Sequence, residues 1–182
     1  MRVTSFAHMT AVMGLSVILA APAGAETAAE IDAGVQAARD KCAADVPGCE
    51  AAAEKAQGML VFPKVTKGAI GVGGSYGEGA LIVDDRTAGY YSTAAASIGL
   101  QLGGETYAQI IMFTTPAALA DFRNSSGWEV GANAKVAMID QGKAADVNSI
   151  IADNPVVAFI FGQQGLMGDL SVQGSKITKL DR

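Results

Sequence analysis

The chain has 182 residues, half of them hydrophobic and 17% charged, with a formal net charge of −5. This composition is typical of a globular protein and excludes a disordered or collagen-like chain. The acidic balance argues against general nucleic-acid binding. The sequence also contains 22 glycines, which is well above the usual share, and a single histidine, His8.

The first 25 residues have the layout of a secretory signal peptide. Arg2 supplies a positive charge, residues 11–21 form a short apolar run, and residues 23–25 form a small-residue cleavage site. The apolar run is too short to span a bilayer comfortably, which disfavours the alternative of an uncleaved anchor. We therefore expect an exported protein, periplasmic or secreted, whose mature chain begins at Glu26.

Cleavage would remove Arg2 and His8, and the mature chain would then contain no histidine. Serine–histidine and cysteine–histidine catalysis would be excluded, and so would histidine-ligated zinc, copper or haem. We therefore expect no metal ion, no cofactor and no enzymatic activity. The remaining enzymatic alternative is carboxylate chemistry at Glu78 or Glu105.

Residues 26–48 are expected to form an N-terminal helical segment, followed by a second short helix at residues 50–57. Apolar residues at three- and four-residue spacing give the first helix one buried stripe, formed by Ile31, Val35, Ala38 and Cys42. We expect this stripe to pack on the protein itself. The alternative is a helix lying on a membrane, but the apolar face is mostly alanine.

Cys42 and Cys49 flank a turn that contains Pro47 and Gly48. Because export places the chain in an oxidising compartment, these two cysteines predict a structural disulfide. The alternative, a redox-active pair, would favour the shorter Cys-x-x-Cys spacing.

From Met59 the pattern becomes β-rich, with apolar strand-like runs, a turn-like segment at residues 84–89 and a short helix that begins at Pro116. The dipeptide Gly103-Gly104 predicts a two-residue hairpin turn between strands at 90–102 and 105–114. A further strand region is expected at residues 130–140.

Ten of the 22 glycines lie between residues 68 and 104. Glycines repeated within strands indicate bulges, bends or close backbone approach.

The predicted fold class is therefore α+β. An N-terminal helical hairpin is followed by a curved, mostly antiparallel, glycine-rich β-sheet or small barrel with a short helix. The glycine-rich stretch does not match the dinucleotide or nucleoside-triphosphate loop motifs, so nucleotide binding is not expected.

Two sets of charged residues are candidate site residues. Glu78 lies between two glycines in an apolar run, and it can face solvent, pair with Lys64 or Lys67, or contribute to a polar-ligand site. Lys176 and Lys179 flank Ile177-Thr178 in the same way that Lys64 and Lys67 flank Val65-Thr66. If the two lysine pairs were neighbours, they would form an anion patch suited to lipid headgroups. Otherwise they are edge-strand lysines that block aggregation.

Several segments, in order, resemble the SYLF domain family, whose eukaryotic members are described as lipid-binding or actin-binding. The matching segments include residues 60–65, 71–80, 90–92, 96–103, 110–113, 165–168 and 174–177. The resemblance implies a SYLF-like domain over residues 49–182 that binds lipid. It also implies actin and phosphoinositide membranes as partners of the eukaryotic relatives, which an exported protein would not normally meet.

The expected function is non-catalytic lipid binding at the cell envelope, with a lipid or membrane surface as the partner. The candidate lipid-binding residues are Lys64, Lys67, Lys176 and Lys179. The alternative is a structural or protein-interaction module of the envelope that has no lipid ligand.

Overall fold

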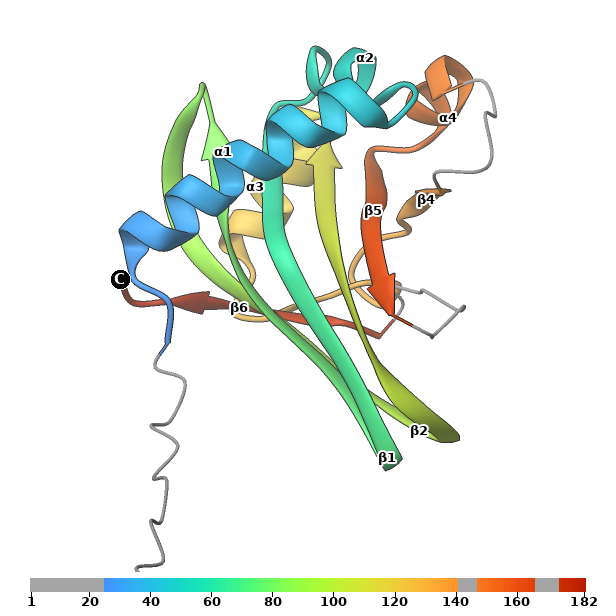
Figure 1. The fold of residues 1–182 in the computed structure, drawn as a ribbon. Coiled ribbons are helices and arrows are strands. Elements are labelled where there is room, and N and C mark those ends of the chain that lie inside the picture. Colours follow the sequence, from blue (N-terminus) through green and yellow to red (C-terminus); the bar gives the residue numbers. More distant parts are fainter. Residues whose placement is uncertain (1–24, 141–146, 166–173) are drawn as a thin grey trace, which may run out of the picture.

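The computed structural model describes residues 25–140, 147–165 and 174–182 and shows an α+β fold (Figure 1). The helices are α1 (Ala28–Asp45), α2 (Cys49–Ala53), α3 (Pro116–Asn124) and α4 (Val147–Asp153). The strands are β1 (Gly58–Val83), β2 (Arg86–Phe113), β3 (Trp128–Glu129), β4 (Ala137–Asp140), β5 (Val156–Gly165) and β6 (Lys176–Leu180). This arrangement confirms the predicted fold class. The predicted signal peptide lies outside the described residues, apart from Ala25.

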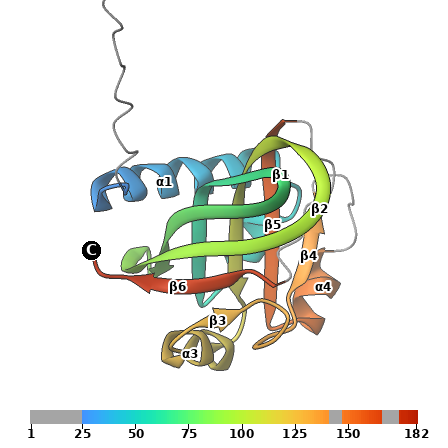
Figure 2. The same ribbon diagram turned by 90° about the horizontal axis from the view of Figure 1, so that it is seen from below.

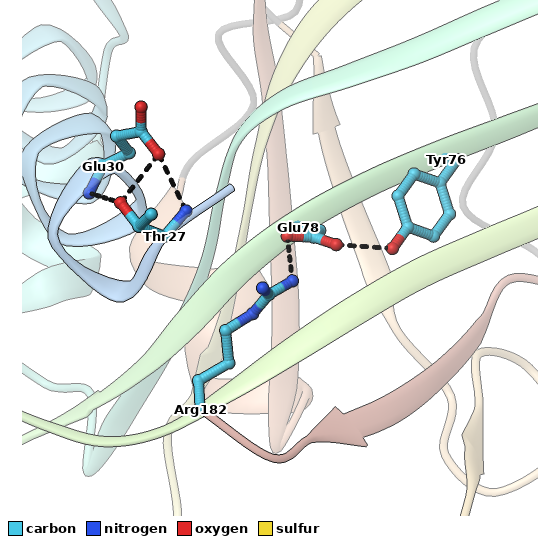
Figure 3. Close-up of polar contacts among 5 residues, drawn as sticks. All are labelled: Thr27, Glu30, Tyr76, Glu78 and Arg182. Atoms are coloured by element: carbon cyan, nitrogen blue, oxygen red, sulfur yellow. Dashed lines mark hydrogen bonds and ion pairs between the residues drawn. The ribbon is translucent and has the colours of Figure 1, made fainter. Parts of the chain in front are cut away.

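The N-terminal hairpin of helices is fixed at both ends of α1. At its start, the Thr27 hydroxyl accepts a hydrogen bond from the Glu30 backbone N–H, and the Glu30 carboxylate accepts one from the Thr27 N–H (Figure 3). This reciprocal capping box satisfies two otherwise unpaired donors. At its end, a buried disulfide joins Cys42 to Cys49 at the start of α2, as predicted. The second helix stops at Ala53, earlier than expected.

Two long antiparallel strands, β1 and β2, form a ribbon that pairs along its whole length, from Gly58 opposite Phe113 to Val83 opposite Arg86. Its turn consists of Asp84 and Asp85, whose φ angles are 50° and 57°. Positive φ at both central residues is what a two-residue hairpin turn of type I′ requires, and Asp tolerates this conformation better than most residues.

The hairpin predicted at Gly103-Gly104 is therefore wrong. These residues lie inside β2, opposite Ala69 and Gly68 of β1. Glycine pairs often mark turns because glycine accepts unusual backbone angles. In this ribbon the chain reverses at Asp84–Asp85, so no second turn is needed at the glycine pair. Pro63 lies within β1, where a register shift between Phe62 and Val65 accommodates a residue that cannot donate a ladder hydrogen bond.

The ribbon bends near its middle and returns toward the helices (Figure 1). At the bend, one residue of β1 separates Ile70 from Val72, whereas three residues of β2 separate their partners Ile98 and Leu102. Extra residues on one strand bend the pair and increase its twist. The bend brings the second half of β1 back against the first half.

The returning half of β1 contacts the first half through glycine. A Cβ atom placed on Gly79 would lie 2.0 Å from the Val61 carbonyl oxygen, and one placed on Gly77 would lie 2.6 Å from that of Lys64. No side chain fits at such distances, so glycine is required at both positions. The close backbone approach expected from the glycine content is thus confirmed in this part of the chain.

The other strands extend the sheet from β2. The first half of β2 pairs with β6 and the second half of β2 pairs with β5, both in antiparallel orientation. Strand β4 pairs with β5 in parallel, and β3 pairs with β6. The sheet curls around an interior, with α1 on one side and α3 on the opposite side (Figure 2). Among the residues that the structure describes, no helix is long and apolar enough to cross a membrane.

Side-chain alternation divides the core in two. Along β2, Ile110 and Met112 belong to a helix-side core that includes the α1 stripe, whereas Ile111 and Phe113 belong to an inner core. The inner core contains an aromatic cluster formed by Tyr91, Phe113, Phe122 and Trp128. A sheet buried on both faces explains why these strands are continuous apolar runs and do not alternate with polar residues.

The strand predicted at residues 130–140 is only partly present. Residues 131–133 form a turn, in which the Glu129 N–H donates to the Asn133 side chain at 2.7 Å and the Gly131 N–H donates to the Ala134 carbonyl at 3.0 Å. Because this turn interrupts the pairing, only β4 forms within the region, and β3 ends just before it.

Substituting the glycines of β1 tests the close approach directly. Gly79→Ala forces a methyl group into the backbone of the first half of β1, and we expect a loss of roughly 3 kcal/mol in the free energy of unfolding. Gly68→Ala, in the same strand with nothing within 4 Å of the new methyl, should be neutral or slightly stabilising. Urea denaturation measures both changes, and equal effects of the two substitutions would contradict the folded-back ribbon.

Candidate functional site

The outer face of the sheet formed by the second half of β1, the first half of β2 and β6 is the candidate site. Strand register aligns Tyr76, Ala94 and Lys176 in one row across it. Ser92 and Thr178 form the neighbouring row. Successive residues of a strand point to opposite faces, so the intervening Thr93 and Ile177, both buried, point to the inner core.

Tyr76 is the most prominent apolar side chain of this outer face. Its side chain is 52% exposed. Among the side chains that the structure describes, it is the one large hydrophobic group that is exposed to solvent. Its cross-strand neighbour in β2 is the small Ala94, and about half of the Tyr76 side chain is open to solvent. The tyrosine hydroxyl donates a 2.7 Å hydrogen bond to Glu78 Oε1 (Figure 3).

Glu78 is buried and has two partners. Its second carboxylate oxygen, Oε2, accepts a 2.5 Å hydrogen bond from Arg182 Nη2, which follows β6. The alternative that Glu78 faces solvent is therefore wrong, and its ion-pair partner is Arg182 and not Lys64 or Lys67. Because both oxygens are bonded within the protein, Glu78 fixes the Tyr76 hydroxyl and joins β6 to β1 across β2.

Helix α1 is attached to the edge of this face. Asp32 of α1 accepts hydrogen bonds from the Thr87 and Tyr90 hydroxyls, each at 2.9 Å. Arg39 forms an ion pair with Asp85 at 2.7 Å. These contacts hold the helix against the ribbon turn and leave the row that contains Tyr76 and Lys176 uncovered.

The four candidate lysines occupy two strands that both pair with β2. Lys64 and Lys176 are exposed, and Lys67 lies opposite the buried Glu105. The three-residue spacing in β6 places Lys176 and Lys179 on opposite faces of the strand. Lys176 is therefore the candidate that shares the outer face with Tyr76. A role of these lysines in lipid binding stays a prediction.

Glu105, the other carboxylate considered for catalysis, lies on the inner side of β2. It is 4% exposed, and its Oε2 atom has no hydrogen-bond partner; the same holds for Nε2 of the buried Gln109. Across residues 25–140, 147–165 and 174–182, no group of three or more His, Cys, Asp or Glu side chains lies close enough to hold a metal ion.

All four tyrosines have a raised phenol pKa. Burial is the main cause for each of them. The hydrogen bond to Glu78 adds to the effect at Tyr76, and the bond to Asp32 does so at Tyr90. At Tyr107 the nearby Glu105 charge raises the pKa, while a hydrogen bond with Ser75 opposes this shift.

No local sequence pattern marks Tyr76 or Arg182 as a site residue. Tyr76 lies in a glycine-rich run that predicts no particular face without the register of β1. Arg182 is 104 residues from Glu78, and no local pattern indicates an ion pair over that separation.

A spectrophotometric titration at 295 nm tests the tyrosine environments. A phenol whose pKa is raised in the folded state keeps its proton to a higher pH in the folded chain than in the unfolded chain. It therefore stabilises the fold below its unfolded-state pKa, and this stabilisation is lost as pH rises through the folded-state pKa. We therefore expect all four phenols of the folded chain to ionise above about pH 10, the ordinary tyrosine value, and to ionise earlier in denaturant. Ionisation of any tyrosine of the folded chain below pH 10 would contradict the structure.

Substitution at the ion pair tests its structural role. Arg182→Gln leaves the Glu78 carboxylate buried without its cation, and we expect a loss of about 1–3 kcal/mol in unfolding free energy. The double variant Glu78→Gln/Arg182→Gln removes the buried charge and should be more stable than Arg182→Gln alone. Strictly additive effects in this double-mutant cycle would show that the two side chains do not interact.

Comparison with known proteins addresses the C-terminal half of the chain. Residues 94–182 match the model of the Ysc84 family, described as Las17-binding protein actin regulator. A comparison with curated proteins found no significant match. The matched segment begins within β2 and includes β6, Lys176 and Arg182. The resemblance drawn from the ordered sequence motifs is thereby confirmed over residues 94–182, which are similar to the Ysc84 family of SYLF domains.

Proposed function

We propose that the protein is exported and binds lipid at the cell envelope, without catalysis, through the outer face that contains Tyr76 and Lys176. The similarity of residues 94–182 to the Ysc84 family supports a lipid- or actin-binding type of domain, and the layout of residues 1–25 supports export. The observation that carries the proposal is the uncovered Tyr76 ring in the same row as Lys176.

The chemistry of this row suits the boundary between lipid headgroups and acyl chains. Tyrosine combines an apolar ring with a polar end and is enriched at membrane interfaces. A lysine contributes attraction to anionic headgroups while its methylene stem rests on apolar surface. The small side chains of Ala94 and Ser92 allow a flat surface to approach the strands. Because the chain is acidic overall, binding should depend on this local face and not on net charge.

Vesicle co-sedimentation tests the proposal. The purified chain should sediment with vesicles of phosphatidylglycerol and cardiolipin at low salt, and less with phosphatidylcholine alone. Tyr76→Ala should weaken binding about tenfold because the buried ring contribution is lost, and Lys176→Glu should weaken it further at low salt. Tyr76→Phe keeps the ring and should bind like the unmodified chain.

Lys41→Glu is the matched control for charge. Lys41 is an exposed residue of α1 whose side chain lies close to Gly162 of β5, away from the outer face. The substitution makes the same charge change as Lys176→Glu and should leave sedimentation unchanged. Equal losses in the two lysine variants, or no binding to any vesicle at low salt, would contradict the proposed face.

A second candidate function is protein binding without a lipid ligand. The family description names proteins that bind Las17 and regulate actin, so a partner protein on the same outer face is the alternative. Chemical crosslinking that captured a stoichiometric protein, together with native mass spectrometry that found no retained lipid, would favour this alternative.

A further inference from the structure

A cavity lies between the helical hairpin and the sheet, separate from the outer face. It has a volume of about 160 Å³ and is lined by α1, α2, β1 and β2. Eight of its ten lining residues precede residue 94, where the family match begins. The cavity therefore depends on the N-terminal helices, and the family assignment does not account for it.

The floor of the cavity is apolar. Met59 is half-buried, and the fully buried Ile110 and Met112 complete the floor from β2. Methionine is flexible and polarisable, so it adapts to apolar groups of different shape. Cys49 lines the wall, and its disulfide to Cys42 fixes the spacing of the two helices that enclose the space.

The mouth of the cavity has an excess of negative charge. The Arg39 guanidinium is paired with Asp85, which lies outside the lining residues. Asp40 accepts a 2.9 Å hydrogen bond from the neutral Gln36 amide, and Glu50 is exposed in the first turn of α2. Among the lining residues, the two carboxylates of Asp40 and Glu50 therefore outnumber the one cation, Arg39, which is already paired with Asp85.

From this combination we infer that the cavity binds a primary alkylammonium group, with its chain against Met59, Ile110 and Met112 and its ammonium beside Asp40 and Glu50. A cavity of about 150 Å³ holds a six-carbon apolar molecule such as benzene, so the space suits a chain of about six carbons. The acidic mouth selects a cation over a carboxylate of the same length. This inference does not rest on lipid binding at the outer face.

Calorimetric titration of the purified chain with alkylammonium ions of four to ten carbons tests the inference. Affinity should rise about fourfold for each added methylene, as expected for apolar burial, and level off near six carbons when the cavity is filled. Hexylammonium should bind at least tenfold more tightly than hexanoate. Equal affinities for the two ions, a continued rise up to ten carbons, or no binding of hexylammonium would overturn the inference.

Substitutions at the cavity locate the site. Ala43 lines the cavity but is exposed, so Ala43→Leu should fill the mouth and abolish hexylammonium binding without disturbing the core. Ala44→Leu, at the next exposed position of α1 and outside the lining, is the matched control and should bind normally. Glu50→Gln should weaken hexylammonium but not hexanol. Unchanged binding by Ala43→Leu would place the ligand elsewhere and overturn the inference.

Discussion

The fold depends on the contact of β1 with itself. The second half of the strand passes so close to the first that the backbone at Gly77 and Gly79 meets the carbonyl groups of Lys64 and Val61. This contact brings the two halves of the ribbon together around the inner core. It also places Tyr76 and Glu78, the residues that alternate with these glycines, on the outer face. The candidate lipid-binding surface is therefore a consequence of the same close approach.

The sequence predicted most of the local structure because local patterns determine it. The stripe of Ile31, Val35, Ala38 and Cys42 marks α1, and the turn between Cys42 and Cys49 marks the disulfide. The density of glycines indicated curvature and close backbone approach. The turn-like composition of residues 84–89 marked the place of the ribbon turn, which the structure has at Asp84 and Asp85. The second turn, expected at Gly103-Gly104, does not form, because pairing between two strands of more than 25 residues continues through these glycines.

The candidate site was less predictable because it is assembled over long separations. Arg182 reaches Glu78 across 104 residues, and Lys176 shares a row with Tyr76 only because both strands pair with β2. The lysine pairs were recognisable in the sequence, but the assignment of each lysine to a face requires the strand alternation that the structure supplies. The helical hairpin adds a second surface, since α1 and α2, which the disulfide joins, line the cavity together with the sheet.

The most direct test of this account is a nuclear Overhauser measurement of the contact within β1. The structure predicts strong cross-peaks between the Hα protons of Gly79 and the ring protons of Phe62, because a substituent on Gly79 would lie 2.7 Å from Phe62 Cδ1. If these cross-peaks were absent in the folded protein, the ribbon would not return onto itself. The outer face built on that return would then be contradicted as well.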